Sequence, residues 1–78
     1  MILKAREYNV NEKRRIIFID VSEEYVNTLK IVIDQLERPN KYTCHLEINE
    51  NGATCKLRYY SNKDFSRIRE YIESYIVH

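Results

Sequence analysis

The stretch of sequence that decides the fold is YTCHLEINENGATCKLRYY, residues 42–60. Apolar and polar residues alternate on both sides of Asn51-Gly52, as they do in two β-strands that each bury one face. An Asn-Gly pair is typical of a type I′ turn, in which both central residues have positive φ. The stretch therefore predicts a β-hairpin with Asn51 and Gly52 at the centre of its turn.

A two-residue turn at this position also predicts which residues lie opposite one another. The expected pairs are Glu50 with Ala53, Ile48 with Cys55, Leu46 with Leu57, and Cys44 with Tyr59. The apolar face carries Tyr42, Cys44, Leu46, Ile48, Cys55, Leu57 and Tyr59. The polar face carries Thr43, His45, Glu47, Asn49, Thr54, Lys56, Arg58 and Tyr60. Since a strand directs successive side chains to opposite faces, we expect the first set to contribute to the core and the second to face outward.

Two more strands and a helix are predicted before the hairpin. Residues 2–10 alternate loosely, with Leu3 and Ala5 on one side and Lys4, Arg6 and Tyr8 on the other. Residues 16–21 are apolar on both faces, which is typical of a central or doubly covered strand. Ser22 is a good N-cap residue for a helix that Pro39 would end at about Arg38. The core-facing stripe of this helix is Val26, Leu29, Ile33 and Leu36.

A second amphipathic helix begins at Ser61 or Asn62 and runs to the C-terminus. Its apolar residues recur at the same spacing: Phe65, Ile68, Ile72, Tyr75 and Ile76. The order β-β-α-β-β-α predicts an α+β fold in one domain, residues 1–78, with two helices packed on one face of a four-stranded, mostly antiparallel sheet. The order of the strands within the sheet does not follow from the sequence.

Composition limits the classes of function. Thirteen Lys and Arg residues against 12 Asp and Glu give a formal charge of +1, which disfavours a dedicated binder of double-stranded DNA. The one glycine belongs to the hairpin, so a phosphate-binding or dinucleotide-binding glycine loop is excluded. The longest apolar run, residues 16–19, is far too short to span a bilayer. We expect a soluble cytoplasmic protein without a membrane partner.

No nucleophile motif and no cluster with metal-ligand spacing occurs in the sequence, so we expect no enzyme activity, no cofactor and no metal. In the expected register Cys44 and Cys55 lie about four residues apart along the sheet, or roughly 13 Å. That distance is beyond a disulfide or a shared zinc ion, and we interpret both cysteines as small buried apolar residues. His45 and Glu47 could form an acid–base pair, but an open hairpin face favours a solvated Glu47–Lys56 pair instead.

Tyrosine is the unusual residue type here, with seven in 78 residues. Tyrosine is common at protein interfaces because its ring is apolar and its hydroxyl is polar. Ile31 lies off the apolar stripe of its helix and is expected to be exposed. The predicted partner-binding residues are Ile31, Tyr71, Tyr8, Arg58 and Tyr60.

These features favour a small non-enzymatic protein-binding module that occupies the surface of another protein and could also form a homodimer. By analogy of size, such a module would act as an inhibitor, for example an anti-defence protein of a phage or mobile element, or an immunity or antitoxin protein. The alternative hypothesis is a single-stranded nucleic-acid binder. In that case Tyr8 and Tyr60 would stack on bases, and Lys4, Arg6 and Arg58 would contact phosphates on the open sheet face.

Overall fold

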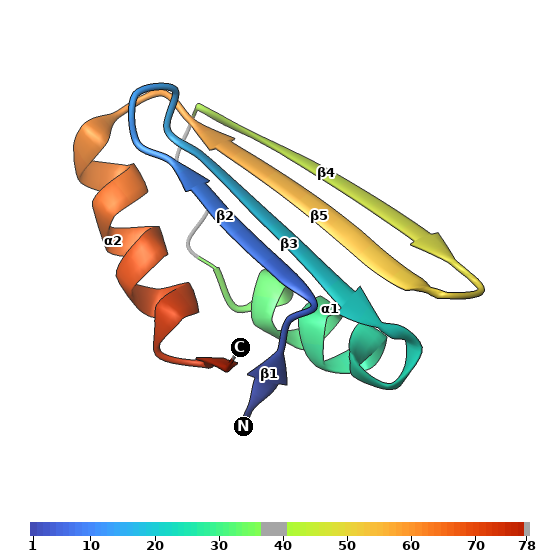
Figure 1. The fold of residues 1–78 in the computed structure, drawn as a ribbon. Coiled ribbons are helices and arrows are strands. Elements are labelled where there is room, and N and C mark those ends of the chain that lie inside the picture. Colours follow the sequence, from blue (N-terminus) through green and yellow to red (C-terminus); the bar gives the residue numbers. More distant parts are fainter. Residues whose placement is uncertain (37–40, 78) are drawn as a thin grey trace.

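The computed structural model describes residues 1–36 and 41–77. The elements are β1 (Leu3–Lys4), β2 (Glu7–Asn11), β3 (Ile16–Ser22), the short 3-10 helix η1 (Glu23–Tyr25), α1 (Val26–Asp34), β4 (Tyr42–Asn49), β5 (Gly52–Tyr59), α2 (Asn62–Glu73) and β6 (Ile76–Val77). Four strands form an antiparallel sheet in the order β2-β3-β5-β4, and β1 pairs with β6 in parallel. Both helices lie on one face of the sheet (Figure 1), so the predicted α+β fold is confirmed.

The core lies between the helices and the two central strands. On β3, Ile17, Ile19 and Val21 point toward the helices and are at most 1% exposed. The helices and β5 complete this core with Leu29, Ala53, Cys55, Leu57, Tyr59, Phe65, Ile68 and Ile72. Ile16 and Phe18 lie on the other face of β3, where they are half-buried and no helix covers them. The prediction of a central strand is therefore confirmed, but the strand is covered by helices on one face rather than on both.

The observed helix boundaries agree only in part with the predicted ones. Ser61 caps α2 as expected, because its Oγ accepts a hydrogen bond from the Asp64 amide at 3.3 Å. Ser22 makes no such bond, and η1 separates it from α1. α1 ends at Asp34, before the predicted end at Arg38, which lies outside the described residues.

The hairpin has the predicted faces but not the predicted pairs. The observed pairs are Asn49 with Gly52, Ile48 with Ala53, Leu46 with Cys55, Cys44 with Leu57, and Tyr42 with Tyr59. The turn is therefore Glu50-Asn51, and the predicted register is wrong by two residues. Because side chains alternate with a period of two, this shift leaves every residue on its predicted face. Among the described non-glycine residues Arg15 alone has positive φ, so the turn is not type I′.

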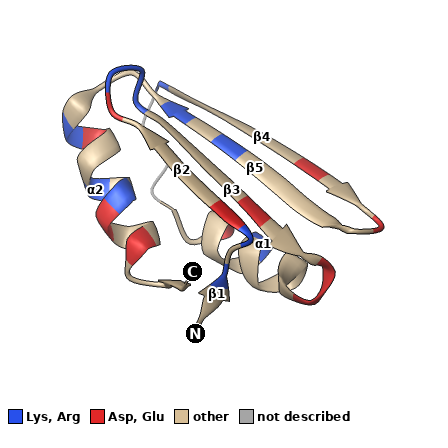
Figure 2. Cartoon of the chain, in the orientation of Figure 1, with Lys and Arg blue, Asp and Glu red and all other residues tan. Residues whose placement is uncertain are grey.

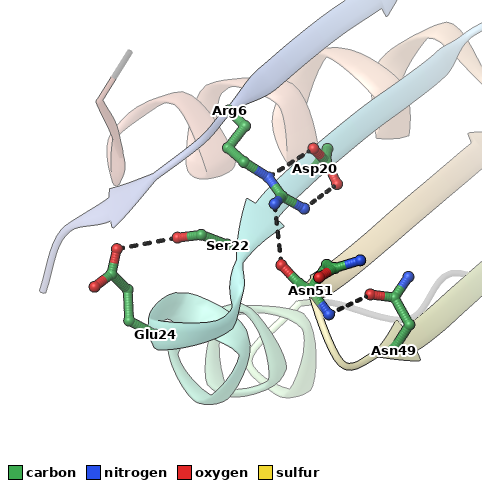
Figure 3. Close-up of polar contacts among 6 residues, drawn as sticks. All are labelled: Arg6, Asp20, Ser22, Glu24, Asn49 and Asn51. Carbon is green, nitrogen blue, oxygen red and sulfur yellow. Dashed lines mark hydrogen bonds and ion pairs between the residues drawn. The ribbon is translucent and has the colours of Figure 1, made fainter.

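Gly52 is needed at the first hairpin pair rather than inside the turn. Its φ is +146°, and a Cβ there would lie 2.0 Å from the Val21 carbonyl oxygen of β3. The same Cβ would lie 2.8 Å from Nη2 of Arg6, which crosses this end of the sheet (Figure 3). Arg6 donates to the Asn51 carbonyl and to the Asp20 carboxylate, each at 3.0 Å. Gly52 thus lets β3 and Arg6 approach the start of β5 closely, and this contact sets where the turn falls.

The N-terminal strand is interrupted at Arg6. Before this point the chain pairs with the C-terminus, since the Ala5 amide donates to the Val77 carbonyl at 3.0 Å. After it the chain pairs with β3, since the Arg6 amide donates to the Asp20 carbonyl at 2.8 Å. The change of partner reverses the alternation, so Tyr8 lies on the helix side of the sheet and packs against the core. The prediction that Tyr8 shares an exposed face with Lys4 and Arg6 is wrong for this reason.

Candidate functional site

A shallow groove separates the two helices on the surface of the helix layer. Its volume is about 260 Å³, and it is lined by Gln35, Arg67, Ile68 and Tyr71. The Tyr71 hydroxyl donates to Oε1 of Gln35 at 2.9 Å and so joins α2 to the residue after α1. A hydrogen bond with the Tyr75 side chain is the main cause that raises the pKa of Tyr71. Ile68 is 2% exposed and forms the apolar floor of the groove.

Ile31 lies on α1 close to Gln35, one of the residues that line this groove. It is 47% exposed, as the sequence predicted, and it stands one helical turn before Gln35 on the same side of α1. Through Gln35 the structure brings the predicted binding residues Ile31 and Tyr71 to one part of the helix layer. We call this set the helix surface: Ile31, Gln35, Arg67, Ile68 and Tyr71.

The other side of the sheet carries a wider basic groove. Its volume is about 510 Å³, and its lining residues are Arg14, Ile16, Thr43, Cys44, His45, Lys56 and Arg58. Phe18 stands beside this groove, since it pairs with Lys56 across the β3–β5 ladder. Figure 2 shows Lys and Arg on β5 and acidic residues at the far ends of β2 and β3. We call this surface the open sheet face.

The predicted binding residues divide between the two sides of the sheet. Arg58 and Tyr60 lie together, with the guanidinium carbon 5.3 Å from the ring centroid, and Tyr60 is 47% exposed. Tyr8 does not join them, because it lies on the helix side and its hydroxyl donates to Glu73 Oε2 at 2.8 Å. Burial, reinforced by the Glu73 carboxylate, raises the pKa of Tyr8. Arg6 is already paired with Asp20 and Asn51, and Lys4 lies on β1, which pairs with β6 and not with this sheet. With Tyr8, three of the predicted residues are therefore not available on the open sheet face.

Sequence reasoning placed Lys56 on the outward face of the hairpin, but it missed Phe18 as a member of the open sheet face. The sequence contained an indication of this, because residues 16–21 are apolar on both faces of the strand. If helices cover only one face of the sheet, the apolar side chains on the other face are left uncovered. The missing information was the strand order. Once β3 lies next to β5, Phe18 stands opposite Lys56, and Ile16 stands opposite Arg58.

His45 and Glu47 pair with each other along β4. Their Nε2 and Oε1 atoms lie 3.0 Å apart, and both side chains are about two-thirds exposed or more. Lys56 lies opposite His45 and Glu47 lies opposite Thr54, so the predicted Glu47–Lys56 pair is wrong for the same reason as the register. Both side chains are largely exposed to solvent, and His45 also lines the open basic groove.

The two cysteines are closer than the predicted register allowed. Cys44 lies opposite Leu57 and Cys55 opposite Leu46, so the cysteines are diagonal neighbours on one face. Cys55 is fully buried whereas Cys44 is exposed, which corrects the prediction that both are buried. The pKa of the Cys55 thiol is raised, mainly because the thiol is buried, and the neighbouring Cys44 raises it further. Among the described residues, no three His, Cys, Asp or Glu side chains are grouped as metal ligands would be.

β4 is the outer strand next to β5, and the helices do not extend over it (Figure 1). Its helix-side residues were predicted to be core, but Cys44 is exposed, Leu46 is half-buried and Ile48 is 50% exposed. An apolar groove of about 210 Å³ runs between the end of α1 and β4. The lining residues are Ile33, Leu36, Tyr42, Cys44 and Leu57. We call β4, with its helix-side residues Cys44, Leu46 and Ile48, the β4 edge.

Comparison with known proteins gives no match: no family model, no curated protein and no solved structure corresponds to this chain. Within residues 1–36 and 41–77, no helix is long and apolar enough to cross a membrane. Three surfaces of the molecule are candidates for binding: the helix surface, the open sheet face and the β4 edge.

Proposed function

We propose that this chain is a small non-enzymatic protein-binding module that acts by occupying the surface of a partner protein. The observation that carries the proposal is the helix surface, where Ile31 is 47% exposed close to Gln35, which lines the groove with Arg67, Ile68 and Tyr71. An exposed isoleucine close to an apolar groove is costly to leave in water and useful to bury in a complex.

The chemistry of the helix surface resembles that of interface centres in general. Tyr and Arg are the residues most enriched at such centres, together with apolar anchors that fit into pockets. Here Tyr71 and Arg67 flank a groove whose volume of about 260 Å³ suits one or two apolar side chains of a partner. Tyr71 is held in place by Gln35, and Arg67 by Asp64 at 3.0 Å, so little side-chain freedom is lost on binding.

The biological setting of the proposal rests on an analogy of size. A balanced protein of 78 residues that blocks a partner would serve as an inhibitor, such as an anti-defence protein of a phage or mobile element, or an immunity or antitoxin protein. The free thiols of Cys44 and Cys55 suit a reducing compartment, which supports a site of action in the cytoplasm. Self-association into a homodimer is part of the same proposal.

The test is a pull-down from lysate of the cells that express the protein, with and without nuclease. We expect a protein partner that survives nuclease treatment and is lost with Ile31→Asp. Lys30→Asp is the matched control, because it places the same acidic side chain on the next exposed residue of α1. A partner retained equally by both variants would refute the role of the helix surface. A partner released by nuclease would refute protein binding itself.

The second candidate function is binding of single-stranded nucleic acid through the open sheet face. The observation in its favour is the basic groove, where Arg14, Lys56 and Arg58 lie near the apolar side chains Ile16 and Phe18. Cations beside an aromatic platform are what a single strand requires, the first for phosphates and the second for base stacking.

Fluorescence anisotropy with a labelled single strand at physiological salt separates the two candidates. If nucleic acid is the ligand, Arg58→Ala should weaken binding and flatten its salt dependence, and Tyr60→Ala should cost roughly 1–3 kcal/mol of stacking. If the protein-binding proposal is right, no micromolar affinity appears for the unmodified protein. Tight binding that Tyr60→Ala abolishes would reverse the ranking of the two functions.

A further inference from the structure

β4 is a long strand at the edge of the sheet. It spans eight residues and, within the part of the chain that the structure describes, it pairs with β5 alone. Every second residue of such a strand directs its N–H and C=O groups away from the sheet, where another strand can pair with them. Proteins commonly block such pairing with proline or lysine, and residues 42–49 contain neither.

The side chains of β4 add an apolar contact to the unpaired backbone. Cys44, Leu46 and Ile48 share the helix side of the strand, where Cys44 is exposed, Leu46 is half-buried and Ile48 is 50% exposed. On the opposite side stand His45 and Glu47, which carry complementary polar groups 3.0 Å apart. A strand that docks here must therefore offer apolar residues on one face and a matching acid and base on the other.

The sequence of β4 itself meets this requirement, because residues 44–48 are self-complementary about Leu46. If two copies of β4 pair antiparallel with Leu46 at the centre, Leu46 lies opposite Leu46 of the second copy. Cys44 then lies opposite Ile48, and His45 lies opposite Glu47, each twice by symmetry. Cross-strand pairs of these two kinds, apolar with apolar and base with acid, stabilise antiparallel sheets.

The neighbouring registers are less favourable. Centring the pair on His45 places the two imidazoles opposite each other and Glu47 opposite Thr43. Centring it on Glu47 places two carboxylates opposite each other and shortens the paired segment to residues 45–49. The Leu46 register alone among these three opposes His45 with Glu47 while it pairs residues 43–49 of both strands.

We propose that this protein forms a twofold-symmetric homodimer by antiparallel pairing of β4 with β4 of a second copy, centred on Leu46. The two four-stranded sheets then become one continuous sheet with both helix layers on the same side. The symmetry is closed, so the dimer has no further β4 edge on which to add copies. Cys44, Leu46 and Ile48 of both chains form its apolar centre. The dimer deepens the homodimer part of the proposed function, and it leaves the helix surface exposed for a partner protein.

Sedimentation velocity and light scattering across a concentration series test the dimer. We expect a dimer at tens of micromolar and a roughly tenfold rise in its Kd with His45→Glu, which places two carboxylates opposite each other twice. The double variant His45→Glu with Glu47→His should restore the affinity, because it exchanges the two partners. Asn9→Glu is the matched control, since it makes a similar change on β2 at the opposite edge of the sheet.

A disulfide cross-link tests the register. In the proposed dimer, Ile48→Cys places a new thiol opposite Cys44 of the second copy. A mild oxidant such as copper phenanthroline should then remove two electrons, release two protons and join the two sulfurs in a covalent dimer. Adding Cys44→Ser should abolish the link, and Asn49→Cys, which lies on the other face, should form none. These substitutions concern exposed side chains, so circular dichroism should show the fold retained.

Four results would overturn the proposal. The first is a monomer at several hundred micromolar. The second is a dimer that dissociates with Ile31→Asp but not with His45→Glu, which would place the interface on the helix surface. The third is a cross-link of the Ile48→Cys variant that persists after Cys44→Ser. The fourth is a monomer that loses a different partner protein with His45→Glu, which would assign the β4 edge to that partner.

Discussion

The substitution Gly52→Ala provides the sharpest test of the hairpin. The new Cβ would lie 2.0 Å from the Val21 carbonyl oxygen, whereas such a contact normally exceeds 3 Å. The obstructing atom is backbone and cannot rotate away, so β5 must shift by more than about 1 Å relative to β3. Arg6 must move as well, because its Nη2 lies 2.8 Å from the same Cβ, and it would lose its bond to the Asn51 carbonyl.

The expected cost combines two causes. An L-residue at positive φ costs about 1–2 kcal/mol. Loss of the Arg6–Asn51 bond and of pairing between Ser22 and Gly52 adds about 1 kcal/mol for each hydrogen bond. We therefore expect the free energy of unfolding to fall by about 3–4 kcal/mol, out of a total of about 4–12 kcal/mol for a domain of this length.

Urea denaturation followed by circular dichroism measures this loss, and Asn51→Ala is the matched control. Asn51 has negative φ and contributes only its backbone groups to the described hydrogen bonds, so its substitution should change stability by less than about 0.5 kcal/mol. If the turn were instead type I′ with Asn51-Gly52 at its centre, both variants would cost a similar amount near 1 kcal/mol. A loss below about 1 kcal/mol for Gly52→Ala would refute the close approach to Val21.

Three further predictions concern tyrosine and cysteine side chains. The buried hydroxyl of Tyr59 has no hydrogen-bond partner among the described residues, so Tyr59→Phe should leave the denaturation midpoint unchanged or raise it, and a loss above about 1 kcal/mol would reveal an unseen partner. The pKa of Tyr8 is raised in the folded protein, so the contribution of Tyr8 to the free energy of unfolding is fully present below the unfolded pKa near 10 and is lost as the pH rises toward the folded value. We therefore expect Tyr8→Phe to reduce the loss of stability above about pH 10. Urea titrations at several pH values measure this difference. Because Cys44 is exposed whereas Cys55 is buried with a raised pKa, a thiol reagent should modify Cys44 in the native protein and Cys55 only on unfolding, and equal rates detected by mass spectrometry would contradict this assignment.

Local pattern in the sequence determined the elements and their faces. The alternation in residues 42–60 assigned every hairpin residue to the correct side, and the spacing of Phe65, Ile68 and Ile72 identified the buried side of α2. Ile31 was correctly expected to be exposed, because it lies off the apolar stripe of its own helix. These properties follow from periods of 2 and 3.6 residues within one segment, so they require no knowledge of distant partners.

Only the tertiary structure decided the register, the strand order and which surfaces remain open. Gly52 was expected inside the turn, but the approach of Val21 from β3 moves it to the first pair of the hairpin. Tyr8 lies on the helix side of the sheet because the chain pairs with β6 before Arg6 and with β3 after it. Ile48 became exposed because two short helices cover β2, β3 and part of β5 but do not reach β4. Each of these outcomes depends on contacts between residues far apart in the chain, which a local sequence pattern does not contain.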